Sequence, residues 1–177
     1  MVRVTQPADI NAVALLAKEI WEEHYVPLLG QEQVDYMLDK FQSAPAIAQQ
    51  IANGYEYYCV MEEEHRSGYF AIVFHPQTFH AQLSKIYVRQ AQRGRGIAKA
   101  IMLFVGARCV ERGVHELWLT VNRHNTGSIA CYRKLGFTQS GSIVQHIGNG
   151  FVMDDYKMEK RIGRSSPATS SPPAALI

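Results

Sequence analysis

Two glycines in residues 93–98 (RGRGIA) constrain the fold of this chain more than any other feature. An apolar, strand-like run over residues 83–88 precedes them, and a helical stretch over residues 97–112 follows. Glycine tolerates the backbone conformations that a tight turn from strand to helix requires. The first amides of a helix lack intrahelical acceptors and carry positive partial charge. The turn therefore predicts a site for a phosphate group.

Three kinds of phosphate-binding loop compete for this segment. A Walker loop is excluded, because the position five residues after Gly94 or Gly96, where its second glycine is needed, holds Lys99 or Ile101. The dinucleotide fingerprint fits its first two glycines but places Lys99 where a small residue is needed, which disfavours an enzyme that uses a nicotinamide dinucleotide. The pattern Gln/Arg-x-x-Gly-x-Gly/Ala fits from Arg93 to Ala98. On this segment alone, a glycine-rich turn without a ligand stays an alternative.

Composition narrows the class of protein. A chain of 177 residues is one domain by size, and its net charge of +2 gives no reason to expect a nucleic-acid partner. It contains no apolar run of the roughly 18 residues that cross a membrane, and its first residues carry no secretory pattern. Three scattered cysteines favour reduced thiols, and seven histidines show no metal-ligand spacing. We therefore predict a cytoplasmic protein with no metal and no nucleic-acid or membrane partner.

Periodicity predicts the order of elements. A strand and three helices come first, then three strands, a helix, a strand, a helix and two more strands, an α/β (α+β) arrangement with a mixed sheet flanked by helices. Asp9 is expected to cap the first helix, and polar residues 63–68 are expected to separate a strand over residues 55–62 from one over residues 69–74. Residues 1–162 form the predicted domain, and the Ser-, Pro- and Ala-rich residues 163–177 a mobile tail.

A second motif, residues 125–137 (NTGSIACYRKLGF), follows residues 93–98, the glycine loop, by about thirty residues. Alone it reads as a capped amphipathic helix ended by Gly136. Together with the loop it closely resembles the GNAT superfamily of acetyl-CoA-dependent N-acetyltransferases, whose pattern is Asn-x-x-Ala-Ile-x-x-Tyr-x-x-x-Gly-Phe. The one departure is Ser128 in place of the alanine. The resemblance covers residues 2–161, and residues 21–25 and 148–158 look most like the bacterial polyamine acetyltransferase branch.

The resemblance implies the fold and the reaction. The GNAT fold has a central mixed, mostly antiparallel sheet of about six to seven strands flanked by helices. The implied activity is direct transfer of the acetyl group of acetyl-CoA, the cosubstrate, to a primary amine: a small amine, a polyamine, an amino acid or a peptide N-terminus. Tyr132 matches the residue that protonates the leaving thiolate. The residues implied to bind the cofactor are Ile86, Tyr87, Val88, Arg93, Gly94, Arg95, Gly96, Ile97, Ala98, Lys99 and Asn125.

Some questions stay open at this point. The strand before the loop carries Ser84 and Lys85, so no general base can be transferred from relatives that place a glutamate there. The helical region that walls the acceptor site in relatives offers four polar side chains, and a water chain could also remove the proton. A non-catalytic module that senses acyl-CoA is the alternative function. The acceptor is not determined, nor is the oligomeric state, for which a homodimer is one candidate. The four side chains are Glu22, Glu23, His24 and Tyr36.

Overall fold

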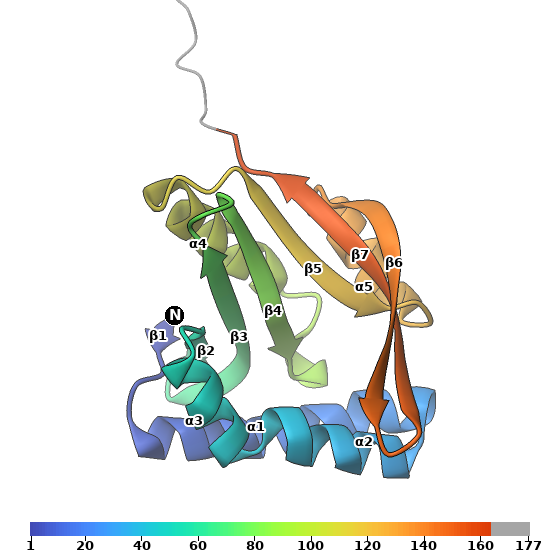
Figure 1. The fold of residues 1–177 in the computed structure, drawn as a ribbon. Helices are drawn as coiled ribbons and strands as arrows, with labels where there is room; N and C mark the ends of the chain where they lie inside the picture. Colours follow the sequence, from blue (N-terminus) through green and yellow to red (C-terminus); the bar gives the residue numbers. More distant parts are fainter. Residues whose placement is uncertain (164–177) are drawn as a thin grey trace, which may run out of the picture.

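A seven-stranded sheet in the order β1-β2-β3-β4-β5-β7-β6 organises the chain (Figure 1). The structure is a computed structural model that describes residues 1–163. The elements in chain order are β1 (Val2–Arg3), α1 (Pro7–Leu29), α2 (Gln31–Met37), the π-helical turn η1 (Leu38–Gln42), α3 (Ala44–Ala52), β2 (Glu56–Glu62), β3 (His65–His75), β4 (His80–Val88), the 3₁₀ turn η2 (Gln90–Gln92), α4 (Ile97–Glu111), β5 (Glu116–Asn122), α5 (Thr126–Lys134), β6 (Thr138–Gly148) and β7 (Phe151–Arg161).

The sheet opens between its two central strands. Within residues 1–163, β4 and β5 form the one parallel pair, and they are paired only where His80–Gln82 lies beside Glu116–Trp118. Beyond that point β4 stays paired with β3 as far as Val88, and β5 stays paired with β7 as far as Asn122. The two halves of the sheet therefore diverge toward the C-terminal ends of β4 and β5, as Figure 1 shows.

Helices cover both faces of the sheet and bury separate clusters of apolar side chains. On one face α4 and α5 pack over strands β2 to β5, with Ile101 and Leu119 at the centre of the cluster. On the other face α1 and α3 pack over β1 to β3, with Ile20 and Tyr69 buried. A third, smaller cluster joins α1 and α2 to the tip of the β6–β7 hairpin around Trp21. Because that hairpin reaches α2, the opening in the sheet is closed from below by helices (Figure 1).

The predicted α/β (α+β) fold with a mixed, mostly antiparallel sheet is confirmed, and two local predictions were wrong. Asp9 does not cap α1, because the helix begins at Pro7 after Gln6 and Asp9 lies in its first turn. The hairpin turn is also shorter than expected: β3 starts at His65, since Arg66 and the residues after it still pair with β2. The predicted tail lies outside the described residues, apart from Gly163.

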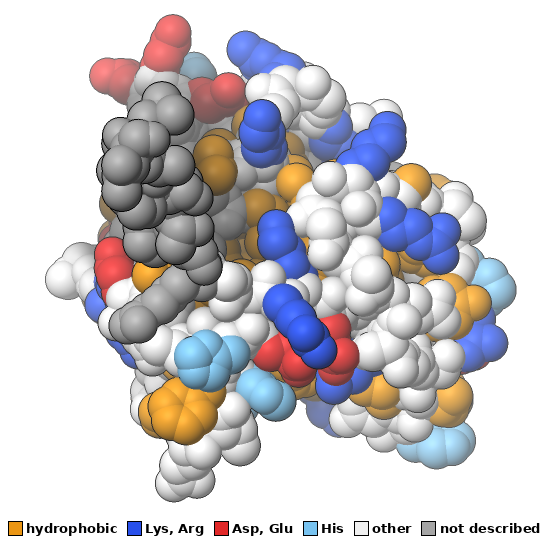
Figure 2. Space-filling model, turned by 90° about the horizontal axis from the view of Figure 1, so that it is seen from above, with side chains coloured by type: hydrophobic (Ala, Val, Ile, Leu, Met, Phe, Trp, Pro, Cys, Tyr) orange, Lys and Arg blue, Asp and Glu red, His pale blue; other side chains and the backbone are white. Residues whose placement is uncertain are grey.

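The surface and the helices add little that is distinctive. On the face shown in Figure 2, Lys and Arg side chains are interspersed with acidic and uncharged ones, so its described part carries no continuous basic surface. Among residues 1–163, no helix is both long enough and apolar enough to cross a membrane.

Candidate active site

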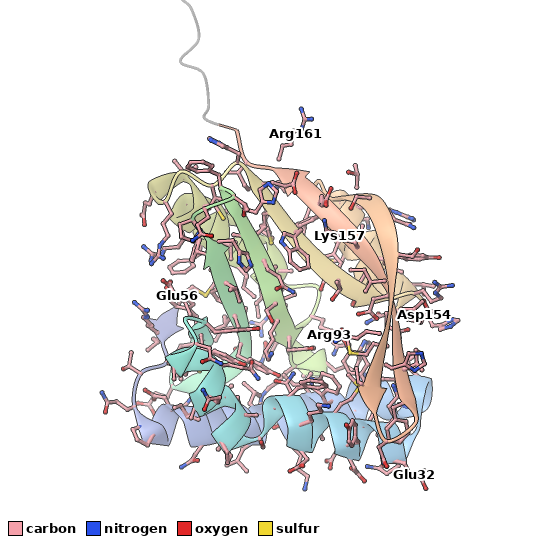
Figure 3. The ribbon with its side chains drawn as sticks, in the orientation of Figure 1. Glu32, Glu56, Arg93, Asp154, Lys157 and Arg161 are labelled. Carbon is pink, nitrogen blue, oxygen red and sulfur yellow. The ribbon has the colours of Figure 1, made fainter. Side chains whose placement is uncertain are left out.

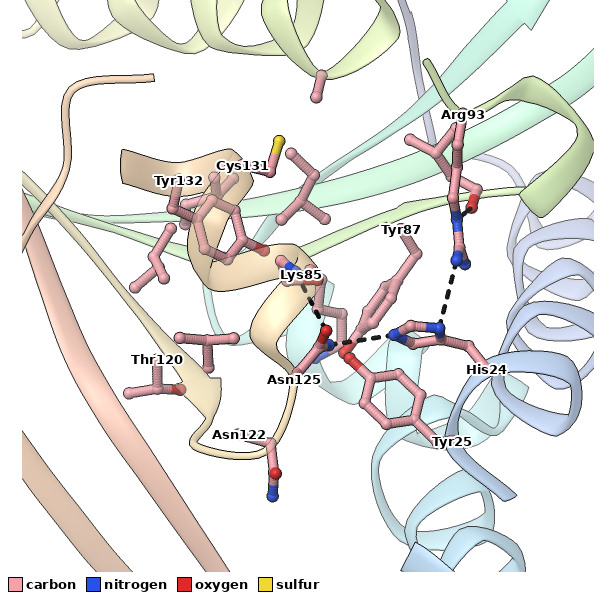
Figure 4. Close-up of a pocket in the computed structure, with 18 of the residues that line it drawn as sticks. His24, Tyr25, Lys85, Tyr87, Arg93, Thr120, Asn122, Asn125, Cys131 and Tyr132 are labelled. Atoms are coloured by element: carbon pink, nitrogen blue, oxygen red, sulfur yellow. Dashed lines mark hydrogen bonds between the residues drawn. The ribbon is translucent and has the colours of Figure 1, made fainter. Parts of the chain in front are cut away.

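A cavity of about 620 Å³ fills the opening between β4 and β5 (Figure 4). Its volume lies in the range of small-molecule sites. β4 lines one side together with the glycine loop and the start of α4. β5 and α5 line the other, and α1, α2 and β7 close the far end. The cavity therefore brings together residues from both sequence motifs, residues 93–98 and 125–137, and from helices that neither motif includes.

The glycine loop leaves a helix N-terminus without a cap inside this cavity. Gly94 and Gly96 have φ angles of +77° and +83°, where side chains with a Cβ are strained. No side chain of the described part of the chain caps α4, and the first bond of the helix runs from the Ala100 amide to the Gly96 carbonyl (3.0 Å). The amides of the first turn of α4, Ile97 to Lys99, therefore have no intrahelical acceptor. This arrangement fits a phosphate group.

The basic side chains of the loop divide between two directions. Arg93 donates from Nε to the Val88 carbonyl (3.0 Å), and its Nη1 lies 3.2 Å from Nδ1 of His24. Arg93 and Lys99 line the cavity. The side chain of Arg95 instead contacts Gln92 and lies 3.8 Å from a carboxylate oxygen of Glu62, away from the cavity lining. Of the three cations that cluster in the sequence, only two thus face the space where a ligand fits.

The edge of β4 that faces away from β3 offers main-chain groups to the cavity. The Arg89 amide donates to the Ser67 carbonyl of β3 (2.9 Å), whereas the Val88 carbonyl accepts from Arg93 on the opposite side. Because successive residues of a strand point their main-chain groups to alternate sides, those of Ile86 and Val88 face the opening. Those of Tyr87 face β3 instead. The strand therefore presents a free edge to an extended ligand over residues 83–88.

Asn125 connects α5 to the loop through His24. Its Oδ1 accepts from the Ser128 amide (3.2 Å), which caps α5, and its Nδ2 lies 3.1 Å from Nε2 of His24 (Figure 4). His24 in turn contacts Arg93, so one chain of polar contacts joins α5, α1 and the loop. Burial, and then the charge of Arg93, lower the pKa of His24 below its usual 6.5. His24 is therefore neutral at pH 7 and adds no positive charge to the cavity.

Tyr132 projects from α5 and lines the cavity (Figure 4). Its ring also packs near Phe137, with the ring centroids 6.0 Å apart. Burial raises the pKa of the Tyr132 phenol, and the nearby Tyr25 raises it further. The hydroxyl therefore stays protonated at neutral pH and can only donate or accept a hydrogen bond until a strong base forms next to it.

The side chains expected to wall the acceptor site separate in the structure. His24 lines the cavity, but Glu22 and Glu23 are exposed and do not. Tyr36 donates its hydroxyl hydrogen to the Ile147 carbonyl (2.7 Å) and so ties α2 to the β6–β7 hairpin. Sequence reasoning missed Asp155, which lines the cavity from β7.

Burial shifts the pKa of three residues that line the cavity, Tyr25, Lys85 and Asp155. Sequence reasoning did not single out Tyr25 or Asp155. Burial raises the pKa of Tyr25 to about 12 and that of Asp155 to about 6. Burial also lowers the pKa of Lys85 to about 8, where the side chain lies near the rings of Tyr55 and Tyr57. Nothing local in the sequence marks Asp155, because it follows Asp154 and only the fold separates the surroundings of the two.

The sequence of this chain is similar to those of known acetyltransferases. The chain matches the Acetyltransferase (GNAT) family over residues 15–137, more than half of its length. N-alpha-acetyltransferase MAK3 of Arabidopsis thaliana is 31% identical over 85 residues, which cover 48% of this chain and 44% of that protein. The aligned part is thus less than half of that relative. An uncharacterized N-acetyltransferase of Mycobacterium bovis is 24% identical over 149 residues, which cover 82% of this chain and 96% of that protein.

Solved structures share the architecture. The PaiA N-acetyltransferase of Thermoplasma acidophilum, in complex with coenzyme A, has a TM-score of 0.76 at 18% identity, over 91% of this chain and 98% of that one. The ribosomal-protein-alanine N-acetyltransferase of Brucella melitensis has a TM-score of 0.66 at 23% identity, over 91% and 99%. At these identities the likeness is one of fold.

Proposed function

The chain belongs to the GNAT family of acetyltransferases, and on that premise we propose that it transfers the acetyl group of acetyl-CoA directly to a primary amine. One observation carries the proposal: the uncapped N-terminus of α4, the free edge of β4 and the Tyr132 side chain all face one cavity. A phosphate, an extended amide-containing arm and a reacting thioester could occupy these three places in turn. A module that binds acyl-CoA without turnover remains the alternative.

The chain's own groups would divide the work of binding the cosubstrate. The amides of residues 94–99 would hold the pyrophosphate at the positive end of α4. The pantetheine arm of acetyl-CoA would pair with β4 as another strand does, through the main chain of Ile86 and Val88. One of these two amides would polarise the thioester carbonyl. Asn125, held by Ser128 and His24, lies where it can contact the arm.

Tyr132 would protonate the departing thiolate. A thiol like that of cysteine has a pKa of about 8.5 in water, so a phenol of higher pKa would not readily give up its proton to it there. Burial raises the pKa of both groups, that of the Tyr132 phenol and that of a thiol, as it does for Cys109, to about 11, so it does not reverse their order. Tyr132 would instead donate a hydrogen bond that strengthens as negative charge develops on the sulfur, and its proton would pass to the thiolate as the C–S bond breaks and the nitrogen resupplies it.

The relatives bear on the acceptor only in broad terms. Besides the N-alpha-acetyltransferase, they include a streptothricin acetyltransferase of Streptomyces lavendulae and an L-methionine sulfoximine/L-methionine sulfone acetyltransferase of Pseudomonas aeruginosa. Two of these names give different acceptors, streptothricin for one and L-methionine sulfoximine or L-methionine sulfone for the other. They support an amine acceptor for this chain and do not favour a polyamine over the other classes.

Binding of acetyl-CoA is the direct test of the cofactor site. At a hundredfold excess over its dissociation constant, acetyl-CoA should stabilise the fold by about 2.7 kcal/mol. For a domain of this size that is a rise of roughly 5–10 °C in Tm, which differential scanning fluorimetry can measure. NAD should produce a much smaller shift. Equal shifts from both ligands, or none from acetyl-CoA, would refute the assignment.

Gly96→Val tests the loop, and Gly113→Val is its matched control. Both glycines have positive φ, +83° and +67°, and a Cβ at either position would meet no protein atom within 4 Å. Each valine should thus cost a similar backbone strain, about 1–3 kcal/mol. Only the valine at position 96 faces the cavity, so only that variant should lose acetyl-CoA binding in calorimetry. Unchanged affinity in Gly96→Val would place the phosphate site elsewhere.

Tyr132→Phe tests turnover. The variant keeps the ring and its packing but lacks the hydroxyl proton, and loss of a general acid lowers a rate by about 10²–10⁴. The decrease should appear in kcat, measured by release of free thiol, with acetyl-CoA affinity and Tm little changed. Full kcat would mean that water or another group protonates the thiolate. If the wild-type chain binds acetyl-CoA but releases no thiol with any amine tested, the sensor alternative is favoured.

A further inference from the structure

We propose that Asp155 binds the ammonium group of the acceptor and removes its proton, and that the acceptor is a primary amine with a single positive charge on an apolar body. The proposal rests on the acetyltransferase function proposed above. It concerns the end of the cavity opposite the glycine loop, formed by α1, α2 and β7.

Asp155 is held by the sheet and points to the acceptor end. It lies opposite Asn122 in the register of β5 and β7. Leu117, Leu119 and Val121 of β5 face α4 and α5, so by alternation Thr120 and Asn122 face α1, and Asp155 shares their side. Its side chain is 6% exposed and lines the cavity. Tyr132 reaches the same cavity from α5, on the opposite face of the sheet.

This buried carboxylate has no ion-pair partner among the described residues. Within residues 1–163, Asp155 takes part in none of the ion pairs, while its neighbour Asp154 pairs with Arg123. Lys157, the next charged residue on the same side of β7, is paired with Glu159. Burying a charge without a partner is unfavourable. An ammonium group entering the cavity would supply the missing positive charge.

The charges around the cavity are arranged by end. Asp155 is the one carboxylate among the described residues that line it. Three of the lining cations, Arg93, Lys99 and Lys134, belong to the glycine loop, α4 and α5, the end where a phosphorylated cofactor fits. The fourth, Lys85 of β4, lies on the α1 and α3 side of the sheet near the rings of Tyr55 and Tyr57, where burial lowers its pKa to about 8. The acceptor end is otherwise mostly aromatic and apolar, with Trp21, Tyr25, Leu29, Met37 and Met153. One carboxylate among apolar walls suits one positive charge, since a second ammonium group would meet no counter-charge there.

The surroundings of Asp155 also suit a base. Burial raises its pKa to about 6, close to the range in which a general base works best. The charged and titratable groups that face it are few. Asp154 on β7 raises the pKa further and Tyr25 of α1 lies nearby, whereas the Thr120 hydroxyl of β5 donates a hydrogen bond that lowers it. From β6 it is opposed by uncharged Ile143.

The reaction balances when the nitrogen loses two protons, one to Asp155 and one to Tyr132. Asp155 takes one proton from the ammonium group, and the freed nitrogen lone pair attacks the thioester carbonyl carbon. The C–N bond forms, the tetrahedral intermediate collapses and the C–S bond breaks. The departing thiolate takes a proton from Tyr132, which regains one from the nitrogen as the amide forms. Asp155 finally releases its proton to solvent, so the products are the acetylated amine, free coenzyme A and one proton.

Asp155→Asn and Asp154→Asn form a matched pair of variants for the test. The first keeps the shape of a cavity side chain and removes its charge, and the second does the same to a carboxylate outside the cavity lining. With L-phenylalaninamide as acceptor, Asp155→Asn should lower kcat/KM by about 10²–10⁴. Its affinity for acetyl-CoA should be unchanged. Asp154→Asn should retain nearly full activity.

Two further readouts separate a base from a merely structural residue. The kcat/KM of the wild type should fall as the pH falls through about 6, and Asp155→Asn should lack this acidic limb. Asp155→Ala should regain activity on addition of formate, which supplies a carboxylate to the emptied space. This second variant also decides the question if Asp155→Asn fails to fold.

The acceptor class is tested with three amines, and the outcomes are distinct. L-Phenylalaninamide and phenethylamine, each singly charged with an aromatic body, should be acetylated with higher kcat/KM than spermidine. A preference for spermidine would overturn the acceptor class. Full activity in Asp155→Asn, or a decrease without the changed pH profile and without rescue by formate, would overturn the role of Asp155. Thiol release with other amines but with none of these three would also overturn the acceptor class, whereas a wild type that binds acetyl-CoA and releases no thiol with any amine tested would instead refute the acetyltransferase function itself.

Discussion

Two buried carboxylates, Glu56 on β2 and Asp155 on β7, are almost equally hidden from solvent, with exposures of 5% and 6%. They lie on strands at opposite sides of the sheet. Figure 3 labels Glu56 on one side and, on the other, Asp154, the residue before Asp155 in the sequence. Glu56 is surrounded by cations: its carboxylate contacts Arg108 at 3.2 Å, Arg112 and, at 3.8 Å, Arg3. Asp155 forms no ion pair with any residue among 1–163, although cations line other parts of its cavity.

The opposite pKa shifts of the two groups follow from these partners. Burial acts to raise both pKa values. At Glu56, hydrogen bonds from Tyr58 and Arg108 and the charges of Arg112 and Arg3 outweigh burial and lower the pKa. At Asp155, the hydrogen bond from Thr120 is too weak to do so. A buried charge whose partners are built into the chain holds the fold together, whereas one whose partner is missing is available to a ligand.

The largest effect on stability is expected at the fully partnered carboxylate. Glu56→Gln removes the negative charge and leaves three guanidinium groups facing one another, so we expect a loss of about 2–3 kcal/mol in the free energy of unfolding. That is a decrease of roughly 5–10 °C in Tm. Glu111→Gln is the control, since Glu111 also pairs with Arg108 but is 58% exposed. A loss no greater than that of the control would remove the distinction between the two carboxylates.

The unpartnered carboxylate should behave in the opposite way. The folded pKa of Asp155, about 6, lies above its ordinary value of 3.8, so ionisation disfavours the folded state. This destabilisation is absent below pH 3.8, grows up to about pH 6 and is then constant. The shift corresponds to at most about 3 kcal/mol, and the weaker hydrogen bond of an amide with Thr120 reduces the gain to about 1–2 kcal/mol.

Urea unfolding of Asp155→Asn and the wild type at pH 8 and pH 5 tests this sign. The variant should be more stable at pH 8, and its advantage should be about 1.4 kcal/mol smaller at pH 5, which removes most of it. Because the same substitution is expected to impair turnover, it would exchange activity for stability. A variant that is less stable than the wild type at pH 8 would mean that Asp155 has a structural partner, as Glu56 does.

The difference between these carboxylates also shows what could be predicted from the sequence. The glycine loop and the Asn125 cap depend on residues within a few positions of one another, so spacing was enough to predict the turn and both helices. The partners of Glu56 lie 53, 52 and 56 positions away at Arg3, Arg108 and Arg112, and only the fold brings them together. No pattern within β2 indicates that its first residue is an ion-pair centre.

The candidate site was predicted to a similar degree. The residues of the cofactor end follow from two local motifs, although the turning away of the Arg95 side chain does not. The acceptor end depends on how α1 and β7 meet across the opening in the sheet. Asp154 and Asp155 are adjacent in the sequence, and strand alternation alone directs one to Arg123 and the other into the cavity. A long-range arrangement of this kind has no signature in one sequence.

Removing one cation at a time should resolve the cluster around Glu56. Arg108 is 25% exposed and also binds Glu111, so Arg108→Ala should cost about 1–2 kcal/mol. The Glu56 carboxylate would keep Arg112, which limits the loss. Thermal or urea unfolding measures it. A loss as large as that of Glu56→Gln would indicate that Arg108 alone compensates the buried charge.

The smallest effect is expected at Arg3, which is 55% exposed and approaches Glu56 only to 3.8 Å. Water screens such a contact, and holding a long side chain in one position costs entropy, so Arg3→Ala should change stability by less than about 0.5 kcal/mol. The change should also shrink further as salt is added, because exposed charges are screened first. Urea unfolding at low and high salt tests both points. A loss above 1 kcal/mol that persists at high salt would show that the three arginines act as one unit, and Glu56 would then depend on the β1 end of the sheet as much as on α4.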